Sequence, residues 1–185
     1  MQKRCDWAKH HPLLIGYHDN EWGIPTHDDQ QLFEMLSLEG MQAGLSWLTI
    51  LKKRENYRQA FNHFDIQKVA HYDTNDIQRL LSNSGIIRNK LKIHSIISNA
   101  NCILKIQDNQ SFSDYLWAFV DHQPIKNHFE KIDDVPAKSA LSEKMSKDLK
   151  KQGFRFVGPV ICYSFMQSIG MIDDHLTGCF KYNED

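Results

Sequence analysis

The sequence of 185 residues predicts an all-α fold. Apolar residues recur three and four positions apart along most of the chain, which places them on one face of a helix. Residues that commonly cap helices, such as Ser, Asp and Asn, precede most of these periodic stretches. No stretch alternates apolar and polar residues for long, so strands are not expected. We therefore expect one helical unit over residues 1–185, without internal repeats.

The first two expected helices span residues 28–38 and 47–61. Asp28 can cap the first helix, which carries apolar residues at helical spacing. Ser46 stands before the second and can accept a hydrogen bond from its first turn. The middle of this second helix is basic.

The next three helices are expected at residues 65–69, 74–81 and 89–106. The first is short and begins at an aspartate that can cap it. The second opens with Thr74-Asn-Asp76 and carries Ile and Leu at helical spacing. The third is the longest periodic stretch of the chain.

Three further helices are expected at residues 111–120, 139–151 and 158–169. A serine can start each of the first two. The last begins at Gly158-Pro159, where proline is tolerated in the first turn, and is apolar almost throughout, so it is expected at the centre of the core. Residues 122–138 contain two prolines and form the longest expected loop.

The charge of the chain is balanced overall but unevenly distributed. The net charge is −1, which excludes a histone-like protein and a disordered polyelectrolyte. Residues 51–105 nevertheless carry ten Lys and Arg against four Asp and Glu. This excess fits either a solvated helix face or a surface that meets phosphates.

The chain has no feature of a secreted or membrane protein. No apolar run approaches the roughly 18 residues that a membrane span needs, and the N-terminus lacks the apolar segment of a signal peptide. The four cysteines are too few for a disulfide scaffold of this length. Cys102 and Cys162 stand among apolar residues and are expected to be buried free thiols. We expect a cytoplasmic protein.

A first candidate site is the turn of residues 83–90, between two expected helices. In a helix–hairpin–helix unit, turn amides and the following helix N-terminus face a DNA phosphate. Gly85 would form the turn, and Arg88, Lys90 and Lys92 would supply positive charge. The second glycine of the usual hairpin is replaced by Ile87. These residues alone favour an ordinary helical hairpin with basic residues facing solvent.

A second candidate is the group Cys5, His18, His175 and Cys179. The i, i+4 spacing of the last two suits neighbouring metal ligands. Two sulfurs and two imidazoles would form a closed tetrahedral zinc site, a structural one that ties together the two ends of the chain. From spacing alone, unrelated histidines and thiols remain the favoured interpretation.

A third candidate lies in the N-terminal third, where aromatic residues, glycines and carboxylates are mixed. Aromatic rings beside one acidic acceptor describe a nucleobase pocket, although Trp and Tyr are also common core residues. Glu39 is unusual because it follows an apolar helix face, where a carboxylate is costly without a partner. The alternative is that Glu39 turns to solvent at the helix end.

These residues make the sequence resemble the 3-methyladenine DNA glycosylase I family, a divergent branch of the helix–hairpin–helix DNA glycosylases. The resemblance extends from residue 4 to residue 179. Its matching segments are residues 4–7, 17–23, 32–35, 38–40, 42–47, 52–57, 85–88, 153–158, 161–167 and 174–179.

The resemblance implies a base-excision repair enzyme with one structural zinc ion. The zinc ligands would be Cys5, His18, His175 and Cys179. Glu39 falls where the family has the pocket carboxylate that accepts hydrogen bonds from the base, and it is the expected catalytic residue. The residues expected to bind the flipped base are Tyr17, Trp47, Trp7 and Trp22.

The resemblance also implies a DNA-binding face. Gly44 and Leu45 match the stretch that meets the gap left by the flipped nucleotide. Gly85, Arg88 and Lys90 would anchor phosphates in a helix–hairpin–helix near residues 75–106. The expected partner is double-stranded DNA with alkylated bases, bound by a monomer without membrane contact.

The implied reaction is hydrolysis of the N-glycosidic bond of 3-methyladenine without strand cleavage, since no lysine is assigned as a Schiff-base nucleophile. One departure from the family is Leu14, where relatives often have an aromatic residue that forms a pocket wall. Two alternatives remain: a non-catalytic module that binds damaged DNA, and a zinc hydrolase, which would need an open metal position.

Overall fold

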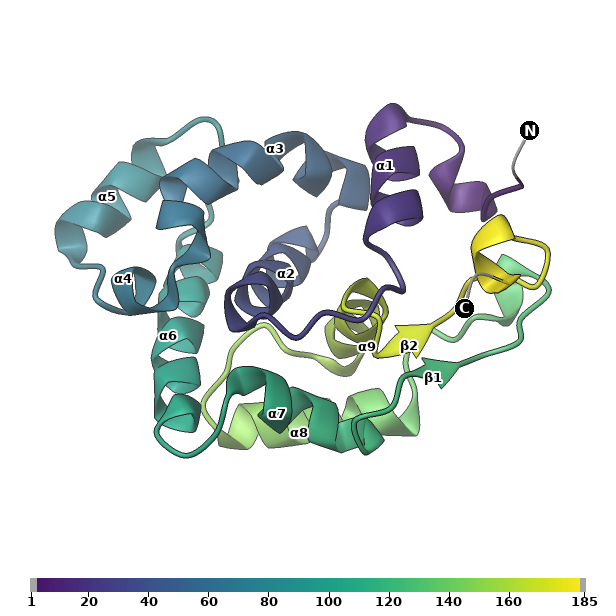
Figure 1. Cartoon of the computed structure of the whole chain (residues 1–185). Helices are drawn as coiled ribbons and strands as arrows, with labels where there is room; N and C mark the ends of the chain where they lie inside the picture. Colours follow the sequence, from purple (N-terminus) through teal and green to yellow (C-terminus); the bar gives the residue numbers. More distant parts are fainter. Residues whose placement is uncertain (1–2, 184–185) are drawn as a thin grey trace.

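The structure is a computed structural model that describes residues 3–183, and these residues are mostly helical (Figure 1). The α-helices are α1 (Pro12–Asn20), α2 (Asp29–Gln42), α3 (Trp47–Ala60), α4 (Ile66–Ala70), α5 (Thr74–Ser82), α6 (Lys90–Gln107), α7 (Phe112–Trp117), α8 (Ala140–Lys151) and α9 (Pro159–Ser168). Short 3-10 helices are η1 (Asp6–Ala8), η2 (Asn62–Phe64), η3 (Ala118–Val120), η4 (Ile132–Asp134) and η5 (Phe180–Asn183). The strands are β1 (Ile125–Lys126) and β2 (Ile172–Asp173).

All eight expected helices are present, as α2 to α9. The predicted caps act as expected at several of them: Asp28 accepts from Gln31 N at 2.8 Å and Ser46 from Thr49 N at 3.2 Å. The cap of α5 is Asp73, one residue earlier than expected. Asp73 and Asp76 form a reciprocal capping box, which satisfies backbone donors that the first helical turn leaves free.

The fold differs from the expectations in two places. Helix α1 was not expected, because its nine residues include a glycine and several polar side chains and lack a clear apolar stripe. It starts at His11, whose ring accepts from Leu13 N at 3.1 Å. The expectation of no strands also fails, because β1 pairs in parallel with β2. Two residues per strand are too few to produce a period-two pattern.

The core is built around α2 and α9, which pack against each other in the middle of the helices (Figure 1). In α2 every residue from Leu32 to Met41 is buried, so this helix is covered on all sides. Burial of one Leu or Phe side chain stabilises a fold by about 1.5–3 kcal/mol, so this helix is a rigid support for any side chain it carries.

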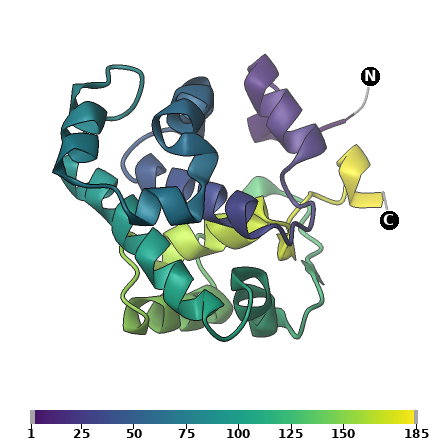
Figure 2. The ribbon, with the colours of Figure 1, turned by 60° about the vertical axis from the view of Figure 1, so that its left-hand side comes forward.

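The two ends of the described chain lie side by side (Figures 1 and 2). Phe180 N donates to Lys3 O at 2.8 Å, which joins the segment before η1 to η5. Within residues 3–183, none of the helices has the length and apolar character that crossing a membrane requires.

Candidate functional site

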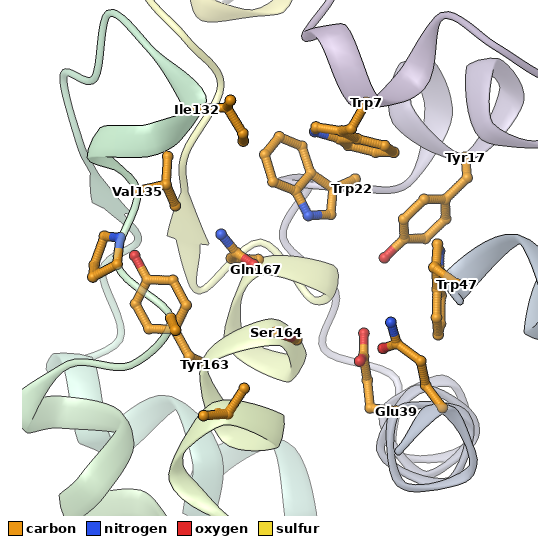
Figure 3. Close-up of a pocket in the computed structure, with 14 residues that line it drawn as sticks. Trp7, Tyr17, Trp22, Glu39, Trp47, Ile132, Val135, Tyr163, Ser164 and Gln167 are labelled. Atoms are coloured by element: carbon orange, nitrogen blue, oxygen red, sulfur yellow. The ribbon is translucent and has the colours of Figure 1, made fainter. Parts of the chain in front are cut away.

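A cavity of about 450 Å³ opens between the N-terminal helices and α9 (Figure 3). Its lining comes from η1, α1 and the turn that follows it, α2, α3, the segment around η4, and α9. The lining residues are Trp7, Tyr17, Trp22, Glu39, Gln42, Trp47, Ile132, Val135, Pro136, Ala137, Val160, Tyr163, Ser164 and Gln167. All five residues predicted for base binding and catalysis are therefore brought together in one cavity.

Four aromatic rings form one side of the cavity (Figure 3). The Trp7 and Trp22 rings meet edge to face with centroids 5.1 Å apart, and the Tyr17 and Trp47 rings lie 5.2 Å apart with a tilt of 54°. Ring pairs at such distances hold each other in place. The indole nitrogen of Trp47 is buried without a hydrogen-bond partner among the described residues. This side can therefore present rigid ring faces to a planar ligand.

The Glu39 side chain points toward these aromatic rings (Figure 3) and is only 4% exposed. The alternative that Glu39 turns to solvent is thus excluded by its position on the buried helix α2. Burial raises the pKa of Glu39 from 4.5 to about 8, because a carboxylate loses hydration there. Burial likewise raises the pKa of Tyr17 well above its usual range, so its hydroxyl stays a neutral donor.

The opposite side of the cavity was not predicted. Ile132 and Val135 from the segment around η4 face the aromatic side, together with Tyr163 from α9 (Figure 3). Tyr163 and Gln167 each donate a hydrogen bond of 2.7 Å to the buried carboxylate of Asp174. The loop carries no periodic signal. Tyr163 and Gln167 lie in the matching segment 161–167, but no site role was expected for either residue.

Gly44 and Leu45 lie in the turn between α2 and α3, at the edge of the cavity. They line a smaller adjoining pocket of about 200 Å³ together with Glu39. Gly44 has a φ of 79°, a left-handed conformation that favours glycine. Leu45 is 39% exposed, which is unusual for a large apolar side chain beside a buried helix.

The predicted hairpin turn lies between α5 and α6 and is fastened to α3. Gly85 O accepts from Asn56 Nδ2 at 3.2 Å, and Tyr57 Oη accepts from Ile87 N at 3.0 Å. A Cβ at Gly85 would lie 3.0 Å from Asn56 Cγ, so this close approach leaves little room for a side chain. The side chains of Arg88 and Lys90 are exposed beyond the turn.

Lys92 differs from its predicted role. We expected it to add exposed charge to the hairpin, but it is 7% exposed and its ammonium donates to backbone carbonyls near the end of α2. Lys92 lies at the third position of α6, where the helix already turns toward α2.

Three of the four predicted metal ligands are brought together. The ligand atoms of Cys5, His18 and Cys179 lie within 4.8 Å of one another, and all three residues are buried. His175 lies outside this group, with its ring 5.0 Å from that of His18. Its Nδ1 donates to Asp173 Oδ1 at 2.7 Å, while its Nε2 is buried without a partner among the described residues. The expected free thiols Cys102 and Cys162 are buried elsewhere.

Leu14 does not line the 450 Å³ cavity; it is partly buried and packs against the core. Leu14 was expected to alter one wall of the pocket, but it makes no direct contribution to the lining of this cavity.

The profile of the family described as methyladenine glycosylase matches residues 7–182. The chain belongs to this family. DNA-3-methyladenine glycosylase 1 of Escherichia coli (strain K12) is 50% identical over 181 residues, 97% of each chain. A crystal structure of 3-methyladenine DNA glycosylase I matches with a TM-score of 0.94 and 53% identity, covering 96% of this chain and 98% of that one.

A second structural match to the family is a variant of 3-methyladenine DNA glycosylase I in complex with 3-methyladenine. It has a TM-score of 0.94 and 39% identity and covers 98% of each chain. The resemblance inferred from the sequence motifs is thus confirmed at the level of the family.

Proposed function

We propose that this chain is a DNA glycosylase that hydrolyses the N-glycosidic bond of 3-methyladenine in alkylated DNA and so begins base-excision repair. The observation that carries the proposal is the buried carboxylate of Glu39 at the aromatic side of a cavity that can hold a nucleobase. The named activities of the family relatives agree with it.

The aromatic side of the cavity would select the lesion by its charge. Methylation at N3 makes adenine cationic, and the faces of Trp and Tyr attract a cation by roughly 0.5–2 kcal/mol each. Trp47, Tyr17, Trp7 and Trp22 would bind the lesion in this way. An unmodified adenine lacks the charge and would gain only the weaker stacking energy.

Glu39 would respond to the same charge. A cation beside a buried carboxyl lowers its pKa, so Glu39 would release its proton when the lesion enters. The resulting carboxylate would accept hydrogen bonds from the base edge, which a charged acceptor strengthens. Because the cationic base is already a good leaving group, the protein needs only to hold it while water attacks the sugar.

The lesion would reach the cavity by rotation out of the duplex. Leu45, exposed at the cavity edge, would occupy the gap left in the base stack, and Gly44 would let the backbone turn there. Gly85, Arg88 and Lys90 would anchor the backbone in a helix–hairpin–helix, with the N-terminus of α6 toward a phosphate.

A structural zinc ion fits the residues at the two chain ends. Cys5, His18 and Cys179 supply the clustered donors, and His175 Nε2 is the buried nitrogen that needs a partner. Asp19 and Asp173 accept hydrogen bonds from the Nδ1 atoms of the two histidines, which orients the Nε2 atoms as ligands. Four protein ligands would leave no position for water, which disfavours a zinc hydrolase.

Release of free base from methylated duplex DNA, followed by chromatography, tests the proposal. We expect 3-methyladenine in the supernatant, an uncleaved strand, and no borohydride-trapped adduct. Because one chain supplies the whole cavity lining, we expect a monomer to suffice. Tight binding to the damaged duplex with no released base would favour the non-catalytic binding module.

A further inference from the structure

Lys92 joins two parts of the proposed DNA-binding face. Its ammonium donates to Met41 O at 2.9 Å and to Ala43 O at 2.6 Å. These carbonyls stand on either side of Gln42, the last residue of α2. Carbonyls at a helix C-terminus lack helical partners and carry the negative end of the helix dipole, so a buried cation is well placed there.

The carbonyl that Lys92 binds most closely belongs to the start of the exposed turn. Ala43 is followed by Gly44, with its φ of 79°, and by Leu45. Leu45 N donates to Gln42 O at 2.6 Å, so the turn folds back on the end of α2. Glu39 lies one helical turn earlier on the same helix. A shift of this helix end would therefore move Leu45 and the cavity edge together.

On its other side Lys92 belongs to the hairpin. It stands in the first turn of α6, where the Asn89 side chain accepts from Lys92 N at 3.1 Å. The preceding turn is held on α3 by Asn56 and Tyr57. The Lys92 side chain is thus a direct link between the start of α6 and the turn that carries Leu45.

Burial of the charged Lys92 side chain at this position costs free energy. Burial lowers the pKa of Lys92, because the charged ammonium loses hydration there. An apolar side chain of similar length would avoid the loss of hydration. An apolar side chain, however, could not donate hydrogen bonds to the two carbonyls that the Lys92 ammonium binds.

We propose that Lys92 is a positioning residue for base extrusion. It holds the Ala43–Leu45 turn at a fixed position relative to the hairpin. Leu45 is then aligned with the gap in the base stack while the hairpin holds the phosphates. This inference rests on the proposed function. It assigns to Lys92 no contact with the base and none with the reacting atoms.

The test compares Lys92→Met with the wild type in three measurements. They are single-turnover release of 3-methyladenine from methylated duplex, the same release from methylated single strands, and affinity for free 3-methyladenine. We expect release from duplex to fall about 10- to 100-fold. Release from single strands and affinity for the free base should change less than about threefold, because neither requires Leu45 to fill a gap in a base stack. The expected fall in the duplex rate corresponds to the loss of about one charged hydrogen bond.

Matched variants separate positioning from general stability. Leu45→Ala should show the same pattern as Lys92→Met, and Lys92→Arg, which keeps donors, should recover part of the duplex rate. Lys105→Met, at the exposed far end of α6, should leave all three measurements unchanged. Lys92→Gln is measured in the same way if Lys92→Met is too unstable to assay.

Three outcomes would overturn the inference. One is a wild-type duplex rate in Lys92→Met, and another is an equal loss in duplex release, single-strand release and free-base affinity. The third is loss of cooperative unfolding in both the Met and Gln variants, since Lys92 would then support the fold as a whole. If the wild-type chain itself releases no base, the proposed function fails, and with it this inference.

Discussion

The rings of Tyr17 and Trp47 meet at a tilt of 54° with their centroids 5.2 Å apart. Rings at this distance are already in contact, so no planar base fits between them. They form a corner: a base that enters the cavity can stack on one ring and meet the other at its edge or hydroxyl. Glu39 lies beside this corner (Figure 3).

Truncation of Trp47 should therefore weaken the enzyme strongly. Stacking of one base on an aromatic side chain contributes about 1–3 kcal/mol, so Trp47→Ala should lower kcat/KM for lesion release about 5- to 150-fold. Trp47→Phe should retain most of the activity. The control is Phe119→Ala, an aromatic truncation outside the cavity lining. Unchanged activity of Trp47→Ala would exclude it as the stacking ring.

Glu39 should make stability depend on pH. Its pKa is raised from 4.5 to about 8 by folding, so its favourable contribution is complete below pH 4.5 and is lost as the pH rises toward 8. Glu39→Gln should therefore be more stable than the wild type at pH 9, by on the order of 2–5 kcal/mol, and nearly equal at pH 4.5. Urea denaturation at both values measures this.

The matched control for that experiment is Glu143→Gln, an exposed glutamate at the start of α8. Its difference from the wild type should vary little between the two pH values. A Glu39→Gln variant that is equally stable relative to the wild type at pH 4.5 and pH 9 would mean that the carboxyl is hydrated in the folded protein.

Removal of the charge of Arg88 or Lys90 should weaken the dependence of DNA affinity on salt concentration. Each lost phosphate contact lowers the slope of log affinity against log salt by about 0.9. Arg88→Gln and Lys90→Gln should each do so on undamaged duplex, equally for all sequences. Lys105→Gln should keep the wild-type slope. If all three variants retain that slope, the phosphate-facing surface lies elsewhere on the chain.

The proposed zinc site predicts one bound zinc ion per chain. Cys179→Ser should lose the ion and lower the melting temperature, because the two ends of the chain would no longer be tied together. Cys102→Ser, which changes a buried thiol outside the cluster, should keep full metal content. Elemental analysis and thermal denaturation measure both. A metal-free wild-type protein, purified without chelators, would contradict the site.

Local features of the sequence predicted the helices well. Asp28 and Ser46 cap α2 and α3 through hydrogen bonds to residues three positions later, which a short window of sequence contains. The cavity residues from the family motifs also came together. Features that depend on distant partners were missed. Strand β1 exists only because β2 lies beside it, and the wall of Ile132 and Val135 forms only when the loop meets α9.

The role of a charged residue depends on whether its side chain is buried, and the sequence alone does not show this. Glu39 and Lys92 both looked compatible with solvent exposure. The first is enclosed because α2 is covered on every side, and the second because α6 begins against the end of α2. Three metal-ligand candidates converge because the chain ends meet, a contact that spacing along the sequence does not reveal.

We propose that the Glu39 cavity holds and releases the methylated base. The single-turnover rate of 3-methyladenine release from duplex DNA, compared among the wild type, Glu39→Gln and Glu143→Gln, tests this role of the cavity. We predict release by the wild type and by Glu143→Gln at equal rates. Glu39→Gln should be about 10- to 150-fold slower, since it loses a hydrogen bond to a charged group. Release by Glu39→Gln at the wild-type rate, or no release by the wild type, would contradict this role of Glu39 and its cavity.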